Sequence, residues 1–472
     1  DSVGLITARN GIEIGARPGV AASISVDGNM IVSGITTFGG AISGTTATFS
    51  GAISGDGSGL TGVASTDNIR TNTNATFLQN INVGVAITAG KLGIGFTDTN
   101  VKVGNTALDS LTTGVQNTSV GQASLTSNTT GSNNSAVGHR ALNANTTADS
   151  NTAVGRDALF TNTTGGENTA VGAFALDTSN STGNTAVGNA ALTSLTTGSY
   201  NVAVGRNALA DQTTASDNVA IGNKALESNT TGTNNVAVGA NALDANTTSS
   251  DNTGIGDNAL GANTTGAQNT AVGSGSLNAN TTASNNTAVG YQALTTNSTG
   301  ASNSALGRRT LRLNTTGNNN VAIGYQALEA NTTGYDNIAI GYNAMDAMQT
   351  GGYSIAIGSG ALGAYTGSEQ TAIGLNALGE CTTGYDNTAV GISALKETTT
   401  GAHNTAVGDD ALKNNSTGNS NTALGKQALV TNTTASYNTA IGKDALYACQ
   451  TGNSNTAVGH DSLTANTSSQ NT

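Results

Sequence analysis

The chain has 472 residues, yet only 9% of them are charged, and it contains 64 glycines, 1 proline and no tryptophan. Its net charge is −12 and its few basic residues are scattered, which excludes the clustered cationic surface that nucleic-acid binding requires. No apolar run approaches the roughly 20 residues of a membrane span. The chain begins at Asp1 without a methionine or a visible signal peptide, so we expect it to be processed or to be part of a longer protein.

The N-terminal hundred residues differ from the rest of the chain. Residues 28–63 read GNMIVSGITTFGGAISGTTATFSGAISGDGSGLTGV. This stretch resembles segments of phage tail fibres, especially those of cyanophages and related marine phages, and GDGSGLTGV is its most specific part. The resemblance implies a β-rich, trimeric fibre or stalk segment over residues 1–65, followed by a connector over residues 66–99.

Residues 100–472 form a repeat with the consensus G-x-x-A-L-x-x-N-T-T-G-x-x-N-T-A-V. The glycine that closes each NTAVG is taken as an anchor, and the other positions are counted from it. There are 22 anchors, separated by nineteen spacings of 17 residues and two of 16, which follow Gly172 and Gly358. Position −1 is always Val, Ile or Leu, position −2 is nearly always Ala, position −4 is Asn in 20 repeats, and position +4 is Leu in 21. Such regularity predicts a repeat architecture.

The consensus predicts one coil of a β-solenoid. NTAVG is short and β-branched, which favours a strand, and the glycines suit tight turns. A helical repeat needs about 33 residues or more, so a period of 17 excludes it. The sequence therefore predicts an all-β fold, a parallel β-solenoid of about 22 stacked coils that forms a rod roughly 105 Å long at about 4.8 Å per coil.

Stacked coils place each repeat position above its counterpart. We expect aliphatic side chains to fill the coil, including Val154, Leu159, Val171, Leu176, Val204 and Leu209. Asparagines at position −4 are expected to form an amide ladder, with Asn134, Asn151, Asn168 and Asn201 among them. The other interpretation is that this asparagine is a turn residue, because asparagine tolerates a left-handed backbone. The core of one coil is thin, so we also expect an oligomer that associates through the alanine face, with Ala153 turned toward a partner.

Two further resemblances concern the repeat. NTAVG-x-x-AL is similar to the head repeat of trimeric autotransporter adhesins, whose units read like SVAIG-x-x-A, have a usual period of 14 and form a parallel β-roll. The extra residues are expected in the xxNTTGxx arm, where both short repeats also lose a residue. Residues 286–300, NTAVGYQALTTNSTG, resemble arrays in tail-fibre-like proteins that end in a self-cleaving chaperone. Both families imply a homotrimer. The chain ends within a repeat, so we expect it to continue or to have lost a C-terminal part.

Catalytic and metal-binding constellations are not evident in the sequence. His139, His403 and His460 lie far apart, without Cys or His at ligand spacing. There is no P-loop, nucleophile elbow or dinucleotide fingerprint, and carboxylate pairs such as Asp409-Asp410 occupy variable, solvated positions. We therefore expect no enzyme activity, no cofactor and no metal. Cys381 and Cys449 share a repeat position four repeats apart, too far for an intrachain disulfide.

The ten tyrosines all lie between Tyr200 and Tyr447. Exposed aromatic rings on a polar rod can stack against sugars or a partner. The candidate recognition residues are Tyr291, Tyr325, Tyr335, Tyr342, Tyr353 and Tyr385. The alternative interpretation is that these residues merely decorate a variable face. Residues that replace Asn in the arm are expected to pack inside, namely Leu111, Leu195, Met348 and Tyr365.

Together these features predict a structural protein, the rigid homotrimeric rod of a phage tail fibre or virion appendage that presents a host-surface-binding region. Its expected partners are further copies of itself, other virion tail proteins and a host cell-surface glycan, and its expected location is the virion or the extracellular surface. A bacterial trimeric surface adhesin is the alternative. An ice-binding solenoid is a weaker one, because adjacent threonines of NTT point to opposite sides of a strand.

Overall fold

The computed structural model describes residues 21–24, 30–33 and 99–472 of the chain. The chain divides into two units, Asp1–Gly90 and Lys91–Thr472. In the first unit, β1 (Ala21–Ile24) pairs with β2 (Met30–Ser33) in an antiparallel arrangement. The stalk expected over residues 1–65 and the connector expected over 66–99 otherwise lie outside the described residues, apart from residue 99.

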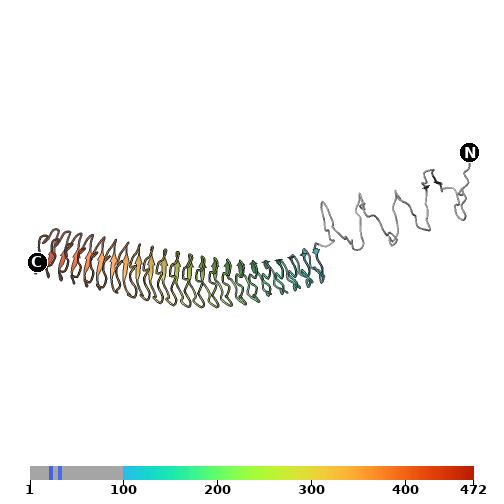
Figure 1. Cartoon of the computed structure of the whole chain (residues 1–472), viewed down its shortest axis with the longest axis horizontal. Coiled ribbons are helices and arrows are strands. Elements are labelled where there is room, and N and C mark those ends of the chain that lie inside the picture. Colours follow the sequence, from blue (N-terminus) through green and yellow to red (C-terminus); the bar gives the residue numbers. More distant parts are fainter. Residues whose placement is uncertain (1–20, 25–29, 34–98) are drawn as a thin grey trace. The chain divides into compact units, whose positions relative to one another are not determined.

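The second unit is a parallel β-solenoid in which each coil contributes one three-residue strand, and its described residues contain no helix. Each strand pairs in parallel with the strand one repeat later, as Thr152–Val154 does with Thr169–Val171. The strands line up in a single column along the rod (Figure 1). This confirms the predicted all-β solenoid and its period. The strands are β3 (Val101–Val103), β4 (Thr118–Val120), β5 (Ser135–Val137), β6 (Thr152–Val154), β7 (Thr169–Val171), β8 (Thr185–Val187), β9 (Val202–Val204), β10 (Val219–Ile221), β11 (Val236–Val238), β12 (Thr253–Ile255), β13 (Thr270–Val272), β14 (Thr287–Val289), β15 (Ser304–Leu306), β16 (Val321–Ile323), β17 (Ile338–Ile340), β18 (Ile355–Ile357), β19 (Thr371–Ile373), β20 (Thr388–Val390), β21 (Thr405–Val407), β22 (Thr422–Leu424), β23 (Thr439–Ile441) and β24 (Thr456–Val458).

The interior of the rod is built from stacked leucine and alanine. Leu159, Leu176 and Leu209 at position +4 are fully buried, as predicted, and the alanines at positions −2 and +3 are buried beside them. Gly254 takes the place of the position −2 alanine in its coil, and a Cβ there would lie 3.3 Å from Cδ1 of Leu243. The space between the strand and the leucine row therefore admits only a small side chain.

The prediction that position −1 fills the coil is wrong. Val154 is 38% exposed, Val171 is 36% exposed, and Val204 is partly exposed. Side chains alternate along a strand, so the three residues of β6 cannot all point inward. Ala153, which was expected to face a partner, is completely buried, and its neighbours in the strand point outward instead.

The predicted asparagine ladder is confirmed. Oδ1 of Asn151 accepts a hydrogen bond from the backbone N–H of Asn168 at 3.0 Å, while its Nδ2 donates to the carbonyl of Gly165 at 3.0 Å. One buried side chain thus satisfies backbone groups at two points of the coil. Asn134, Asn168 and Asn201 accept in the same way from the next coil, and all four are fully buried.

A second ladder runs through the asparagines at position +7. Nδ2 of Asn145 donates to Oδ1 of Asn128 at 2.8 Å, and Asn162 continues the row more loosely at 3.4 Å. The row stops where the next coil supplies no amide. Oδ1 of Asn331 and Oδ1 of Asn432 are therefore buried without a hydrogen-bond partner, because Met348 and Cys449 follow them.

Most coils turn through left-handed backbone at three non-glycine positions: +2, +4 and the residue before the position −4 residue. In one coil these are Asp157, Leu159 and Glu167, with φ of 58°, 51° and 60°. Such conformations are unfavourable for residues other than glycine. Each of the three donates its N–H to a carbonyl of an adjacent coil, at 3.0 to 3.1 Å. The turns are therefore stabilised by neighbouring coils rather than within their own coil.

The first 16-residue coil shows how a missing residue is accommodated. In regular coils, two consecutive threonine N–H groups share one backbone carbonyl of the next coil, as Thr146 and Thr147 share that of Thr163. The N–H groups of Thr163 and Thr164 instead bond to Oδ1 of Asn180, at 3.0 and 2.9 Å. A side-chain carbonyl thus replaces the backbone carbonyl in the arm, where the loss was expected.

Candidate recognition surface

The outward side of the solenoid sheet is an apolar, uncharged strip. We call the side chains at positions −3 and −1 of β3–β24 the strand face. Position −1 is aliphatic in all 22 strands, and position −3 is Thr, Ser, Val or Ile. Twelve side chains at position −1 are exposed, from 36% to 66%: Val103, Val137, Val154, Val171, Ile221, Ile255, Leu306, Ile323, Ile373, Leu424, Ile441 and Val458.

The strand face is large for an uncovered surface. Full burial of one Val, Ile or Leu side chain stabilises a protein by about 1.5–3 kcal/mol, which at about 25 cal/mol per Å² corresponds to roughly 60–120 Å² of apolar area. The 22 side chains at position −1, each about one-third exposed, therefore present roughly 400–900 Å² of apolar area to solvent. The largest apolar patch of a typical monomer is about 300–600 Å², and larger ones mark interaction sites. The strand face is therefore the first candidate surface for association.

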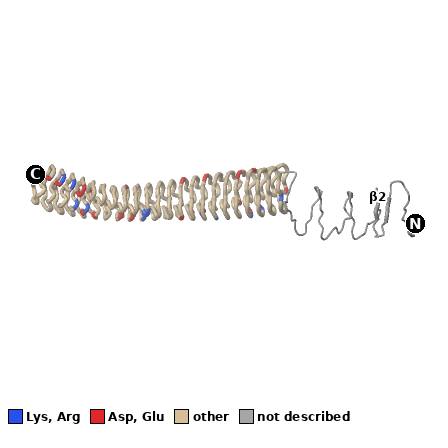
Figure 2. The backbone as a smooth tube through the Cα atoms, turned by 90° about the horizontal axis from the view of Figure 1, so that it is seen from above, with Lys and Arg blue, Asp and Glu red and all other residues tan. Residues whose placement is uncertain are grey.

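Charged side chains are sparse and lie outside the strand face, and most of the rod surface is uncharged (Figure 2). They pair both within coils and between adjacent coils. Nε of Arg140 lies 2.7 Å from Oδ1 of Asp157, and Nζ of Lys426 lies 3.0 Å from Oδ2 of Asp409. The pKa values of Asp177 and Asp244 are raised, and partial burial is the largest cause of each shift. These contacts lie outside the strand face.

Three of the predicted tyrosines lie in one row at position +1. The rings of Tyr325 and Tyr342 stack with centroids 5.4 Å apart and planes at 11°. The guanidinium carbon of Arg308 lies 5.5 Å from the ring centroid of Tyr325 and 5.8 Å from that of Tyr291. Tyr291, Arg308, Tyr325 and Tyr342 thus form a continuous row over four successive coils, held by stacking and cation–π contacts.

The other three predicted tyrosines lie one or two residues before the position −4 residue of a coil. Tyr335 and Tyr353 meet edge to face with centroids 5.2 Å apart, and Tyr335 is the main cause that raises the pKa of Tyr353. Tyr385 contacts the ring of His403 at 4.9 Å, and Nδ1 of His403 lies 3.4 Å from Oδ2 of Asp386. The six tyrosines therefore form a row at position +1 and two separate contacts at positions −6 and −5 of the coil.

The packing predicted for the arm residues is confirmed. Leu195, Met348 and Tyr365 are fully buried, and Leu111 is partly buried against the core. Burial raises the pKa of Tyr365 to about 12, and its hydroxyl donates to the carbonyl of Ser368. Tyr365 is therefore a structural residue and not part of either tyrosine group.

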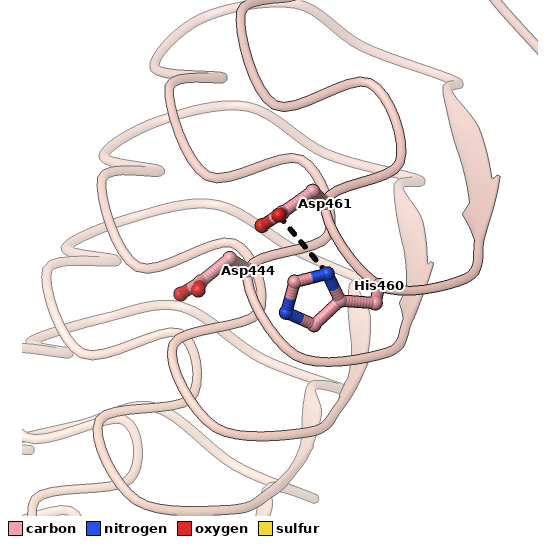
Figure 3. Close-up of side chains that lie close together, drawn as sticks. All are labelled: Asp444, His460 and Asp461. Carbon is pink, nitrogen blue, oxygen red and sulfur yellow. Dashed lines mark ion pairs between the residues drawn. The ribbon is translucent and has the colours of Figure 1, made fainter.

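A cluster that the sequence did not reveal is formed by Asp444, His460 and Asp461 (Figure 3). Their ligand atoms lie within 4.8 Å of one another, and Nδ1 of His460 lies 2.9 Å from Oδ2 of Asp461. Aspartate and histidine can bind a divalent cation. His460 and Asp461 are exposed, however, and the Lys443 ammonium already pairs with Asp444 at 3.1 Å. Aligning the repeats would have shown the two aspartates in one row.

The first threonine of NTT does not present a free hydroxyl row, whereas the second is exposed, as at Thr130 and Thr147. Oγ1 of Thr146 donates to the carbonyl of Thr163 at 3.1 Å, and Thr129 and Thr247 donate to the next coil in the same way. These hydroxyls are used inside the rod, which weakens the proposal that the NTT threonines bind ice.

Both cysteines are buried and free, as expected. Burial raises the pKa of Cys381 to about 11 and also raises the pKa of Cys449. Because the thiolate is the reactive form, we expect neither thiol of the folded protein to react with iodoacetamide at pH 8. Mass spectrometry after labelling should show both modified only in denaturant. An exposed Ser274→Cys variant is the control and should label rapidly. Rapid native labelling of Cys381 would contradict the buried placement.

No helix among the described residues is long and apolar enough to cross a membrane. No protein-family model, no curated protein and no solved structure matches the chain. The function must therefore be argued from the repeat, the strand face and the surface rows.

Proposed function

We propose that the chain is the structural rod of a homotrimeric fibre, a phage tail fibre or virion appendage on the virion or extracellular surface, and that it is not an enzyme. The observation that carries the proposal is the strand face, an uncharged strip in which the aliphatic row at position −1 runs the length of the solenoid. Three copies around a common axis would cover their strips together, as cyclic symmetry allows. The resemblance of the repeats to trimeric adhesin heads and of residues 28–63 to tail fibres supports this choice.

The architecture also suits a mechanical role. Coils contact only their neighbours, so length grows with repeat number while the cross-section stays constant. The two asparagine ladders bond each coil to the next, and charges are too few to make a binding channel. A fibre needs reach and stiffness, and these features supply both. Other tail proteins and a host-surface glycan are the partners we propose for it.

Trimer formation is tested by placing charge on the strand face. The wild-type chain should show three times its 46.2 kDa by light scattering coupled to size exclusion. The triple variant Val187→Lys, Val204→Lys, Ile221→Lys places three cations on successive strands, and it should be monomeric because they could not be desolvated at an interface.

The matched control carries three lysines at position +1, where the chain already has Lys426 and Lys443. Gln122→Lys, Asn223→Lys and Ser274→Lys should leave the trimer intact, because these residues are exposed outside the strand face. A monomeric wild type, or an unchanged trimer in the strand-face variant, would contradict the proposal.

Ice binding is a second candidate, now through a different row. Position −3 is threonine in many coils and points outward beside the aliphatic position −1, which makes a regular flat face. A trimer would cover this face, so the two functions require different states of the rod. If the wild-type protein is monomeric and shows thermal hysteresis, ice binding is favoured. If it is a trimer and shows no thermal hysteresis, the ice-binding proposal is wrong.

A further inference from the structure

We call the strip between the residues at position +2 and those at position +5 the groove, and side chains bridge it in several coils. Nδ2 of Asn143 at +5 donates to the carbonyl of Ala123 at 2.9 Å, and Oγ1 of Thr295 donates to the carbonyl of Gly275 at 3.1 Å. In another coil, Lys224 at +2 pairs with Glu227 at +5 at 2.9 Å. The +5 side chain thus normally closes the groove against the +2 row.

The groove opens at one place. Gly360 occupies position +2, and Gly363 and Gly379 occupy position +5 of two adjacent coils, so three side chains are missing together. A cavity of about 310 Å³ lies there. Small-molecule sites are typically about 300–1,000 Å³ and hold a few placed polar groups. The cavity is therefore large enough for one sugar unit or two.

The same coils depart from the consensus elsewhere. The position +7 asparagine is replaced in four successive coils by Met348, Tyr365, Cys381 and Thr398, and the ladder asparagine by Ser354 and Gln370. The coil that begins at Gly358 is also one of the two with 16 residues. Position +7 also departs from asparagine at Ser179, Leu195 and Gln212, around the other 16-residue coil, but positions +2 and +5 of those coils keep their side chains. The glycines at positions +2 and +5 are therefore what distinguishes the cavity segment.

The walls of the cavity carry both neutral and charged hydrogen-bonding side chains. Asn343 and Asn376 offer carboxamides, Asp346 and Glu380 offer carboxylates, and Lys396 offers an ammonium. Nζ of Lys396 lies 3.9 Å from Oε1 of Glu380, and burial is the main cause that raises the pKa of Asp346. A partly buried carboxyl is stabilised by hydroxyl donors from a ligand.

A tyrosine lies next to a lining residue of the cavity in the sequence. Tyr342 precedes Asn343, is 57% exposed, and accepts through its carbonyl from the N–H of Gly360 at 2.9 Å. Elsewhere in the rod, a position +1 side chain reaches the +2 row of the next coil, since the guanidinium of Arg156 lies 4.3 Å from the ring of Phe174. At Tyr342 the corresponding +2 residue is Gly360, which has no side chain for the ring to contact.

We infer that this cavity is a carbohydrate-binding site, in which a neutral sugar ring packs on Tyr342 while its hydroxyls bond to Asn343, Asp346, Asn376 and Glu380. The inference rests on the proposed function of the rod, for which it names the site and the ligand class. A metal ion is disfavoured, because Asp346 and Glu380 do not belong to the one group of described residues that could hold a metal. The site lies outside the strand face, so a trimer leaves it accessible.

The test fills the cavity without disturbing the backbone. A Cβ at Gly363 would lie no closer than 3.4 Å to other atoms, and threonine occupies position +5 elsewhere, as at Thr126 and Thr295. The full chain would be applied to an array of neutral hexose and N-acetylhexosamine oligomers, and the Kd of the best oligomer measured by calorimetry. We expect Gly363→Thr to weaken binding about tenfold or more, because its side chain occupies the ligand volume.

Gly261→Thr makes the same change at position +5 far from the cavity and should bind like wild type. Tyr342→Ala should also weaken binding and so tests the ring separately. Absence of array binding by the trimeric wild type, or equal binding by Gly363→Thr and wild type, would overturn the inference while leaving the trimeric rod standing. A monomeric wild type that still binds sugar in a Gly363-dependent way would overturn the proposed function alone.

Discussion

Replacing the anchor glycine Gly205 by alanine should destabilise the rod by about 2–4 kcal/mol around that coil. Gly205 has φ of +136°, a conformation that L side chains rarely adopt. A Cβ there would press against the carbonyl oxygen of Gly222 and lie 2.6 Å from its carbonyl carbon. Both atoms belong to the backbone of the next coil, so neither can rotate away.

The measurement is amide hydrogen exchange resolved by peptide. Exchange in the two coils that flank Gly205 should accelerate about 30- to 1,000-fold, since each 1.4 kcal/mol is a factor of ten. Gly261→Ala is the control, because its position holds larger residues in other coils, such as Ala210. Equal exchange in both variants would show that the close approach of the anchor glycines is not a constraint.

Asn201→Asp should be the other severe substitution, with a cost of about 3–5 kcal/mol at pH 7. Asn201 is fully buried, and its Nδ2 donates to the carbonyl of Ala215 at 3.0 Å and to Oδ1 of Asn184 at 3.1 Å. A carboxylate has no hydrogen to donate and would face two acceptors instead. It would also bring an uncompensated charge into the rod.

The effect should depend on pH in a defined direction. Burial and the facing oxygens raise the folded-state pKa of the introduced carboxyl above its unfolded value of about 3.9. The protonated variant is therefore the more stable form near or below pH 4, and stability is lost as the pH rises through the folded pKa. The difference in Tm between Asn201→Asp and wild type should grow from pH 4 to pH 7. Asn223→Asp, at an exposed position +1 where Asp257 and Asp409 occur, should show no such trend.

The period and the ladder at position −4 could be predicted because stacking imposes one requirement on every coil. Position +4 must fill the same interior volume each time, so Leu159 and its counterparts are nearly invariant. Position −4 must satisfy the same backbone groups each time, so asparagine persists at Asn151 and its counterparts. Repetition within one chain thus reports these packing requirements directly.

The two faces of the strand were assigned the wrong way round, because hydrophobicity was taken as the guide to burial. The side chain of Ala153 has a smaller apolar surface than that of Val154, yet Ala153 is the buried residue. The reason is that Leu159 and its neighbours leave room for only a small side chain. The variation held the correct signal. Position −2 is restricted to small residues in nearly every coil, whereas position −1 changes between Val, Ile and Leu, as a side chain with free space can.

The tyrosine rows and the cavity were less accessible to sequence reasoning. The six tyrosines were correctly selected as a group of exposed or partly exposed residues, but their contacts depend on which row each occupies. The cavity depends on absent side chains at Gly360, Gly363 and Gly379. Aligned repeats show these glycines at positions +2 and +5, but only the three-dimensional structure shows that they border one space.

The left-handed turns have a consequence for how such a rod forms. Asp157, Leu159 and Glu167 are unfavourable conformers whose N–H groups bond to a coil above or below them. A first coil has no such neighbour, whereas every later coil adds to a finished template. The rod should therefore fold by slow nucleation of the first coils, followed by fast addition of further coils at both ends. A coil damaged in the middle would act as a stacking fault and leave two shorter rods, each with its own growing end.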